Sequence, residues 1–376
     1  MEKYEVLKKL VELDTVKNKE NGQLMTYVEK VLQTKGFKTE TKDKNLVMSI
    51  GDNARLGFLG HMDTVEFIDG WNTNPHEFMI KDNCMHGLGI CDMKGGIAAM
   101  VDAISETDFS KLKYGMKIYL TYDEEISFAG TYDLVKQKEK FPDVMIFGEP
   151  TDNKVLMGCK GLLECDCSFK GIKVHSSTPD KGVSANLNAV KFIYEINEFY
   201  EKYIKCINES KFEVPYTTMN VGILSGGSAK NSIPAECYAT FDFRTIKEEH
   251  NDIILDKLKQ LSEKYDCDIN VIEKISPFIN EVNFIKADGC ASFMTEASLI
   301  KTNTKIILGT GPVTAHEVNE YITVGSYNEL IKQYKEIISK VCKWKEGALS
   351  SNKYIFNGHD MWENANGDGL IGIFLL

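Results

Sequence analysis

The chain lacks the features that mark several large classes of protein. Its 376 residues contain no apolar run of about 18 residues or more, so no membrane partner is expected through a spanning helix. The net charge is −11 and the 44 Lys and Arg residues are scattered among 55 Asp and Glu residues, which argues against a nucleic-acid partner. No strand–GxGxxG–helix arrangement is present, so no dinucleotide site is expected.

Paired cysteine motifs are also missing. The ten cysteines form no Cys-x-x-Cys sets, and Cys165 and Cys167 lie on one face of an expected strand. We therefore expect reduced, buried cysteines rather than disulfides or a thiolate zinc site. Residues 1–17 have the pattern of an amphipathic helix and lack the apolar stretch of a signal peptide, which predicts a cytoplasmic location.

The first half of the chain alternates helix and strand patterns. Helices are expected over 1–17, 20–36, 93–105 and 130–140, and short buried strands in NLVMSIG, LGFLGHM, MKIYLTYD and VMIFGE. This alternation predicts an α/β fold with a mostly parallel sheet flanked by helices. Ligands in such sheets gather at the carboxyl ends of the strands.

The middle of the chain has a different order of elements. Residues 161–275 follow the β-α-β-β-α-β order of a ferredoxin-like α+β unit, which predicts an inserted lid or dimerisation domain. Its helix 184–204 is expected to turn a set of apolar side chains inward. These are Leu187, Val190, Ile193, Tyr194 and Ile196.

The insert divides the larger domain into two parts. A metal-binding catalytic domain is expected over 1–160 and 276–345, with helices at 283–299 and 325–343 after the insert. Residues 346–376 form an atypical C-terminal tail whose Asn, Gly and Ser content predicts loose structure.

Five segments place side chains that can bind metal near the ends of expected strands. These segments are LGFLGHMDTV, LGICDMKGG, IYLTYDEEISFAG, VMIFGEPT and LGTGPVTAHEVNEY. They offer His61 and Asp63, Asp92, Glu124 and Glu125, Glu149, and His316 with Glu317. The set has no thiolate and is rich in carboxylate, which suits two divalent metals with a bridging oxygen ligand.

Each candidate also has a structural explanation when it is taken alone. Asp92 precedes an expected helix and is a good N-cap, and Glu124 with Glu125 fits a solvated acidic turn. His61 fits a strand-end histidine bonded to a neighbour, and His316 a surface histidine. Five such segments on one predicted sheet edge are much harder to explain by chance, so the joint pattern favours a metal site.

At these residues the chain resembles the acetylornithine deacetylase and succinyl-diaminopimelate desuccinylase family of co-catalytic zinc hydrolases. The matching segments are GHMDTV, GICDMKGG, YDEEISFAGT, GEPT, VHSSTPDKGVSAN, GGSAKNSIP, DFR, TEAS and AHEVNEY. They span roughly 55–325, and their order, spacing and flanking residues agree with the family. KFEVPYTTMNVG, MTEASLI and LGTGPVTAHEVNEYI are most similar to the acetylornithine deacetylase branch.

The resemblance implies a metal-binding role for five residues. His61 and Glu149 would hold one metal, and Glu125 and His316 would hold the other. Asp92 would bridge the two ions, with a cis peptide bond after it. The family implies two divalent ions, with zinc as the first candidate, and cobalt suits the same ligands.

The remaining site residues are implied in the same way. Glu124 would be the general base, and Asp63 would orient His61. His175, in the insert, would help to bind the developing oxyanion, in relatives at the site of the partner subunit of a dimer. Asn231 and Arg244 would lie near the substrate carboxylate.

The implied reaction is hydrolysis of the amide bond of an N-acyl amino acid. The first candidate is conversion of N2-acetyl-L-ornithine to L-ornithine and acetate in arginine biosynthesis, by a homodimer joined through the insert. Alternatives within the family are a succinyl-diaminopimelate desuccinylase, a dipeptidase or another N-acyl amino acid amidohydrolase. A more distant alternative is a non-catalytic binding protein on the same scaffold.

Overall fold

The structure is a computed structural model that describes residues 3–343, 353–356, 359–363 and 370–372. The chain divides into two compact units. Unit 1 contains 1–155, 281–287 and 300–376, and unit 2 contains 156–280 and 288–299. Residues 156–160, 276–280 and 288–299, which the sequence assigns to the catalytic domain, therefore belong to the same unit as the insert.

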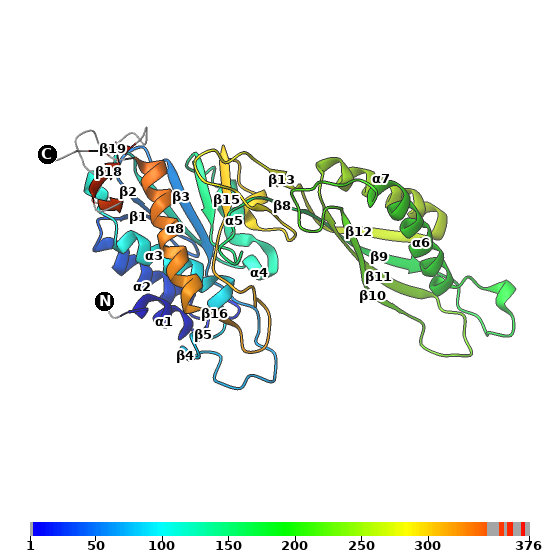
Figure 1. Cartoon of the computed structure of the whole chain (residues 1–376). Helices are drawn as coiled ribbons and strands as arrows, with labels where there is room; N and C mark the ends of the chain where they lie inside the picture. Colours follow the sequence, from blue (N-terminus) through cyan, green and yellow to red (C-terminus); the bar gives the residue numbers. More distant parts are fainter. Residues whose placement is uncertain (1–2, 344–352, 357–358, 364–369, 373–376) are drawn as a thin grey trace. The chain divides into compact units, whose positions relative to one another are not determined.

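A mixed, mostly parallel sheet forms the centre of unit 1 (Figure 1). Its strands lie in the order β1-β2-β6-β3-β7-β15, and β3, β6, β7 and β15 run parallel. The bounds are β1 Lys38–Lys42, β2 Leu46–Ile50, β3 Leu56–His61, β6 Met116–Thr121, β7 Val144–Phe147 and β15 Thr304–Ile307. Nearly every residue of β3 and β6 is buried, as expected for strands covered on both faces.

Helices flank this sheet and form the main core with it (Figure 1). They are α1 Glu5–Val11, α2 Asn21–Gln33, α3 Gly95–Ser105, α4 Glu124–Ser127, α5 Ala129–Lys136 and α8 Val324–Cys342, with short helical turns at Ile90–Lys94 and Phe109–Lys111. Helix α3 is buried almost throughout, because it packs against α8 and lies so close to β3 that a Cβ on Gly60 would be 2.7 Å from Ile97 Cγ1. This packing fixes the segment just before α3.

A small sheet in unit 1 lies beside that segment. It contains β4 Met79–Lys81, β5 Cys84–His86 and β16 Tyr321–Thr323, in the order β16-β5-β4. Because β16 pairs with β5, residues near 320 are held next to residues near 87, far away in the sequence.

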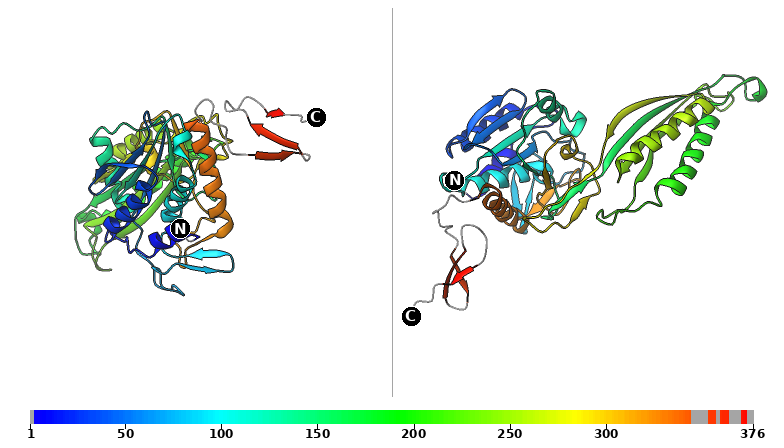
Figure 2. Two further views of the ribbon diagram at one scale, coloured as in Figure 1. Left: turned by 90° about the vertical axis from the view of Figure 1, so that its left-hand side faces the viewer. Right: turned by 90° about the horizontal axis from the view of Figure 1, so that it is seen from above.

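Unit 2 has the expected β-α-β-β-α-β order. Strands β9 Gly161–Lys170, β10 Thr218–Gly226, β11 Glu236–Thr245 and β12 Cys267–Ile275 form an antiparallel sheet in the order β10-β11-β9-β12. Helices α6 Ala185–Phe199 and α7 Glu248–Tyr265 cover one face of it (Figure 2). The unit also contains β8 Leu156–Cys159, β13 Phe278–Ile279 and β14 Gly289–Ala291, and short turns at Pro179–Lys181, Tyr200–Ile204 and Glu296–Ser298.

The burial predicted for α6 is wrong at three positions. Leu187, Val190 and Tyr194 are 59%, 54% and 62% exposed, whereas Ala189, Phe192 and Ile196 of the same helix are fully buried. The helix therefore turns its small and aromatic face to the sheet and leaves an apolar stripe outside.

The helix predicted over 283–299 is also wrong. The structure has strand β14 and the short turn Glu296–Ser298 in this range. Gly289 adopts φ +144°, which no α-helix accepts, and β14 pairs with β8. Phe284 and Ile285, within the same range, pack against the core of unit 1 from a bend that belongs to no helix or strand.

Other expectations concern the cysteines, the membrane and the tail. The ten cysteines form no disulfide bond, and all but Cys84 and Cys206 are buried. In the described part of the chain, no helix is long and apolar enough to cross a membrane. Strands β17 Lys353–Phe356, β18 His359–Glu363 and β19 Leu370–Gly372 form a small sheet, and the rest of the predicted tail from 346 lies outside the described residues.

Candidate metal centre

The candidate ligands of unit 1 converge from separate elements of the fold. His61 is the last residue of β3, and Glu149 lies two residues beyond β7, the parallel neighbour of β3. Asp92 lies in the turn before α3, and Glu125 in the first turn of α4. His316 lies in the loop between β15 and β16 with φ +63°.

Three groups of these side chains are compact enough to hold a metal ion. His61, Asp92 and Glu149 form one group, and Asp92, Glu125 and His316 form another, each with ligand atoms within 4.8 Å of one another. Asp92 belongs to both groups. A third group joins His61, Glu124 and Glu125.

The distances within the first two groups fit shared coordination. Two atoms bound to one tetrahedral Zn²⁺ lie about 3.3 Å apart. His61 Nε2 is 3.0 Å from Asp92 Oδ1 and 3.9 Å from Glu149 Oε2. His316 Nε2 is 3.5 Å from Asp92 Oδ2 and 3.1 Å from Glu125 Oε1. The two oxygens of Asp92 thus face different histidines, as a bridging carboxylate requires.

The electrostatics of the cluster also fit cations. Burial lowers the pKa of His61, but the carboxylates of Glu124, Asp92 and Glu149 outweigh it and raise that pKa well above the usual value. Hydrogen bonds to Asp92 and Glu125 raise the pKa of His316 to about 10. Burial raises the pKa of Asp92, but bonds to His316 and His61 hold it well below the ordinary range. The carboxylates of this cluster therefore stabilise positive charge, such as that of a bound cation.

Asp63 acts on this cluster through two different groups. The His61 ring nitrogen Nδ1 lies 3.0 Å from the main-chain oxygen of Asp63, and the Asp63 carboxylate lies farther away at 3.8 Å. The carboxylate instead accepts hydrogen bonds from the backbone N–H groups of Glu124 and Glu125, at 3.2 and 3.1 Å. Asp63 thus connects the His61 ring to the start of α4.

The sequence places Glu124 and Glu125 at a strand end, and this local prediction is wrong. Strand β6 ends at Thr121, Asp123 adopts a left-handed conformation, and the two glutamates begin α4. The N–H groups of a first helical turn have no partner within the helix, and Asp63 supplies one for both residues. Glu124 Oε2 lies 3.9 Å from His61 Nε2, at the edge of the ligand cluster.

Two further features of the Asp92 turn are visible in the structure. The peptide bond between Asp92 and Met93 is cis, as the family resemblance implies. Glu320, which the sequence analysis does not single out, accepts hydrogen bonds from the backbone of this turn. Glu320 lies four residues after His316 and is only 2% exposed, which is unusual for a glutamate. The sequence does not show this burial.

In unit 2, His175 and Asn231 lie on adjacent loops. His175 pairs with Ser232 in an isolated bridge, and Ser176 N–H donates to the main-chain oxygen of Asn231. Both predicted residues are exposed. Ser177 N–H donates to His175 Nδ1 at 3.2 Å, so a neutral His175 ring carries its proton on Nε2.

Arg244 lies on β11, near the end of that strand. Its Nε and Nη2 atoms each donate to one carboxylate oxygen of Asp242, both at 2.9 Å. The two-pronged contact predicted for a substrate carboxylate is thus made here with a carboxylate of the protein itself.

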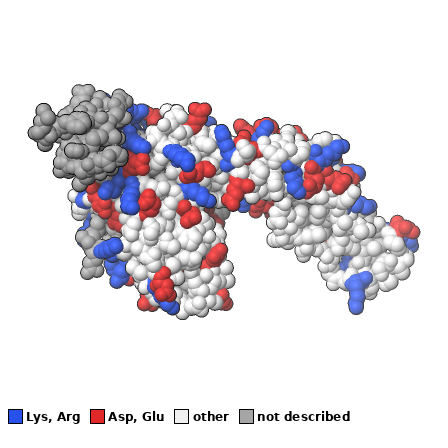
Figure 3. All heavy atoms as spheres, in the orientation of Figure 1, with Lys and Arg blue, Asp and Glu red and all other residues white. Residues whose placement is uncertain are grey.

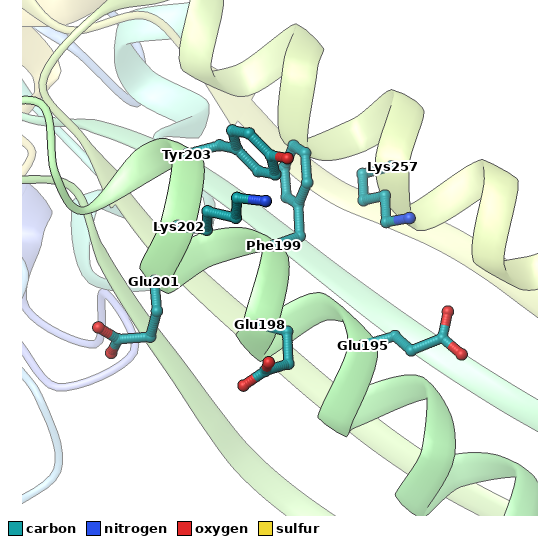
Figure 4. A pocket seen from close by; sticks show the side chains of 7 residues that line it. All are labelled: Glu195, Glu198, Phe199, Glu201, Lys202, Tyr203 and Lys257. Atoms are coloured by element: carbon teal, nitrogen blue, oxygen red, sulfur yellow. The ribbon is translucent and has the colours of Figure 1, made fainter.

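A shallow hollow on unit 2 is a different feature (Figure 4). It is lined by Glu195, Glu198, Phe199, Glu201, Lys202, Tyr203 and Lys257, from α6, α7 and the turn that follows α6. None of the predicted site residues lines it. Figure 3 shows Lys and Arg lying among Asp and Glu on the face that it displays, without a large basic surface.

Comparison with known proteins identifies the family. The curated acetylornithine deacetylase of Pasteurella multocida is 30% identical in an alignment of 357 residues, which covers 85% of this chain and 90% of that protein. Residues 157–267 match the peptidase dimerisation domain of M20 enzymes. This chain belongs to the M20 family of peptidases and amidohydrolases.

Solved structures of M20 enzymes share the fold of this chain. The M20 metallo-carboxypeptidase of Sulfolobus solfataricus has a TM-score of 0.75 and 19% identity, covering 91% of this chain and 99% of that one. The aminopeptidase PepT of Bacillus cereus has a TM-score of 0.73 and 19% identity, covering 90% and 97%. The M20 family consists of hydrolases that use divalent metals, and the chain carries its dimerisation domain in unit 2.

Proposed function

We propose that the protein hydrolyses the amide bond of an N-acyl amino acid, with N2-acetyl-L-ornithine as the first candidate substrate. The observation that carries the proposal is Asp92, whose two carboxylate oxygens face His61 and His316 in two separate ligand groups. The 30% identity to an acetylornithine deacetylase supports this substrate. Ten cysteines that form no disulfide bond are in keeping with the proposed action in the cytoplasm.

The ligand groups would hold two divalent ions, with zinc as the first candidate and cobalt as the second. His61 and Glu149 would bind one ion, and Glu125 and His316 would bind the other. Asp92 would lie between the ions. When bound, such ions lower the pKa of a water molecule and polarise the carbonyl group of an amide.

Glu124 is the proposed general base. Its carboxylate lies at the edge of the ligand cluster, and its backbone N–H is held by Asp63. It would take a proton from the attacking water and later deliver that proton to the leaving amine. The neighbouring Glu125 faces His316, so adjacent carboxylates are assigned different tasks.

His175 is proposed to donate a hydrogen bond to the developing oxyanion. The Ser177 N–H group occupies Nδ1 and thus leaves the Nε2 proton available for this contact. Asn231 and Arg244 are proposed to bind the substrate carboxylate. Arg244 would either release Asp242 and bind the substrate carboxylate in its place, or keep both Asp242 contacts and donate from its remaining terminal nitrogen, Nη1.

Unit 2 is proposed to join two copies of the chain. The exposed stripe of Leu187, Val190 and Tyr194 on α6 is apolar, and the edge strand β10 exposes Ile223 and Leu224 at 53% each. An apolar helix stripe and an edge strand are surfaces that pairing with a second copy would cover. The match to a dimerisation domain over 157–267 supports this surface.

The substrate is tested with metal-reconstituted protein. Protein stripped by a chelator should be inactive, and Zn²⁺ or Co²⁺ should restore hydrolysis of N2-acetyl-L-ornithine. Succinyl-diaminopimelate and dipeptides are assayed in parallel, because they are the substrates of the alternative enzymes within the family. A higher kcat/KM for either would replace the proposed substrate, and no turnover with any of them in the presence of metal would favour a binding protein.

A further inference from the structure

One buried carboxylate holds the turn that carries Asp92. Glu320 Oε2 accepts from the backbone N–H of Gly89 at 2.7 Å. Its Oε1 accepts from the N–H groups of Cys91 and Asp92, at 2.7 and 3.1 Å. Glu320 is 2% exposed, so these bonds are shielded from water and replace the hydration of its carboxylate.

The turn itself needs such an acceptor. Gly87 and Gly89 adopt φ +151° and +74°, and a Cβ on Gly89 would lie 2.4 Å from Thr64 Cγ2. A chain bent in this way points successive N–H groups toward one side, where no strand pairs with them. The three N–H groups therefore converge on Glu320 rather than on a neighbouring strand.

Glu320 also connects the turn to the loop of His316. It precedes β16, and its main-chain oxygen accepts from Gly87 N–H at 3.3 Å. The residue thus holds the 87–92 segment through both its main chain and its side chain. Since His316 is four residues earlier, this contact sets where Asp92 stands relative to the His316 loop.

We propose that Glu320 is a positioning residue that fixes Asp92 between the two metal ions. The inference rests on the proposed function, in which Asp92 is the bridging ligand. A shift of the Asp92 backbone would displace both carboxylate oxygens at once, because each oxygen faces a different histidine. Residues that orient metal ligands from outside the coordination shell typically contribute about 10- to 100-fold to metal affinity or activity.

The test compares Glu320→Gln and Glu320→Asp with the wild-type chain and with Glu317→Gln. Gln keeps the size of the side chain but presents an N–H₂ group to the turn, and Asp keeps the charge but shortens the reach. Glu317 is exposed in the same loop and belongs to none of the ligand groups of the described residues, so Glu317→Gln controls for loss of one negative charge nearby. Each chelator-stripped protein is titrated with Zn²⁺ by calorimetry and with Co²⁺ by visible absorption, and its melting temperature, kcat and KM are measured.

The expected result is that Glu320→Gln and Glu320→Asp weaken metal binding at least about tenfold, alter the Co²⁺ spectrum and lower kcat with little change in KM. Glu317→Gln should match the wild type in all of these. A lower melting temperature with wild-type metal affinity and spectrum would overturn the inference, and so would failure of both Glu320 variants to fold, since both results mean a purely structural role. If the wild-type chain itself binds no metal and hydrolyses none of the amides, the proposed function is wrong, whatever the Glu320 variants show.

Discussion

The Asp63 carboxylate oxygen Oδ2 lies 3.1 Å from the backbone nitrogen of Glu125, 62 positions further along the chain. The same carboxylate accepts from the next N–H group, that of Glu124, through its other oxygen. A residue on the His61 side of the cluster thereby sets where α4 begins. The geometry of the proposed base and of one proposed ligand depends on this contact.

Replacing Asp63 by Asn tests that contact. Asn has one acceptor oxygen in place of two, so one N–H group of α4 would face an N–H₂ donor. We expect kcat to fall about 10- to 100-fold while the fold persists. Steady-state kinetics and circular dichroism measure this, and Asp69→Asn in an exposed loop serves as the control. Wild-type kcat in Asp63→Asn would show that the contact does not position the base.

Glu124→Ala addresses the base directly. The variant should lose about 10²- to 10⁴-fold in kcat, because no other carboxylate would move the proton in the same position. Metal content, measured by atomic absorption, should stay at the wild-type level, since the proposed ligands are other residues. Glu201→Ala, an exposed glutamate of unit 2, should change neither quantity. Unchanged turnover would remove Glu124 as the base.

His175→Ala tests the proposed oxyanion contact in unit 2. Loss of one such donor typically costs about 10²- to 10³-fold in kcat. Metal affinity should not change, since His175 belongs to none of the ligand groups of the described residues. Kinetics together with metal titration separate the two effects, and Lys173→Ala, an exposed neighbour, is the control. A fall in metal affinity instead of kcat would assign His175 to a different task.

Asp102 gives the stability of unit 1 a pH dependence. Burial raises its pKa to about 6, although Tyr327 donates to its carboxylate at 2.7 Å and opposes the shift. The folded state therefore binds more protons than the unfolded state between roughly pH 4 and pH 6, and the free energy of unfolding falls as pH rises through that window. The magnitude is about 3 kcal/mol.

Asp102→Asn keeps an acceptor for Tyr327 but cannot ionise. The variant should lose this slope and should be the more stable protein at pH 7. Urea unfolding from pH 4 to pH 7 measures both quantities, with Asp69→Asn, in an exposed loop of unit 1, as the control. An unchanged slope in Asp102→Asn would assign the pH dependence to other groups.

Val190→Asp probes the proposed surface between two copies. A charge in the exposed stripe of α6 would have to be buried on association, so we expect the variant to be monomeric and the wild type dimeric. Sedimentation equilibrium measures the mass of each. Ile253→Asp is a matched control, because Ile253 is exposed to 43% on the other helix, α7, and should leave the dimer intact. A dimeric Val190→Asp would exclude this stripe from the interface.

Some of the fold is readable in the sequence because it follows from local periodicity. The apolar run that ends at His61 indicates a buried strand, and its alternation with helical segments implies a parallel sheet with its strand ends at one edge. Local periodicity also gave one wrong prediction, because the same apolar pattern can occur in a helix and in a segment with another structure. A helix is predicted over 283–299, but the positive φ of Gly289 and the pairing of β14 with β8 give a strand within that range.

By itself the sequence determined the alternation of elements and the types of side chain that could meet a metal, since both follow from residue chemistry and short-range spacing. Only the tertiary structure decided which groups fix those side chains. Asp63 reaches across 62 positions to Glu125, and Glu320 across 231 positions to Gly89. Likewise, periodicity placed Val190 in an apolar stripe of α6, but only packing of the opposite face on the sheet left it exposed. Contacts between distant segments arise from the packing of whole elements, and no local pattern encodes them.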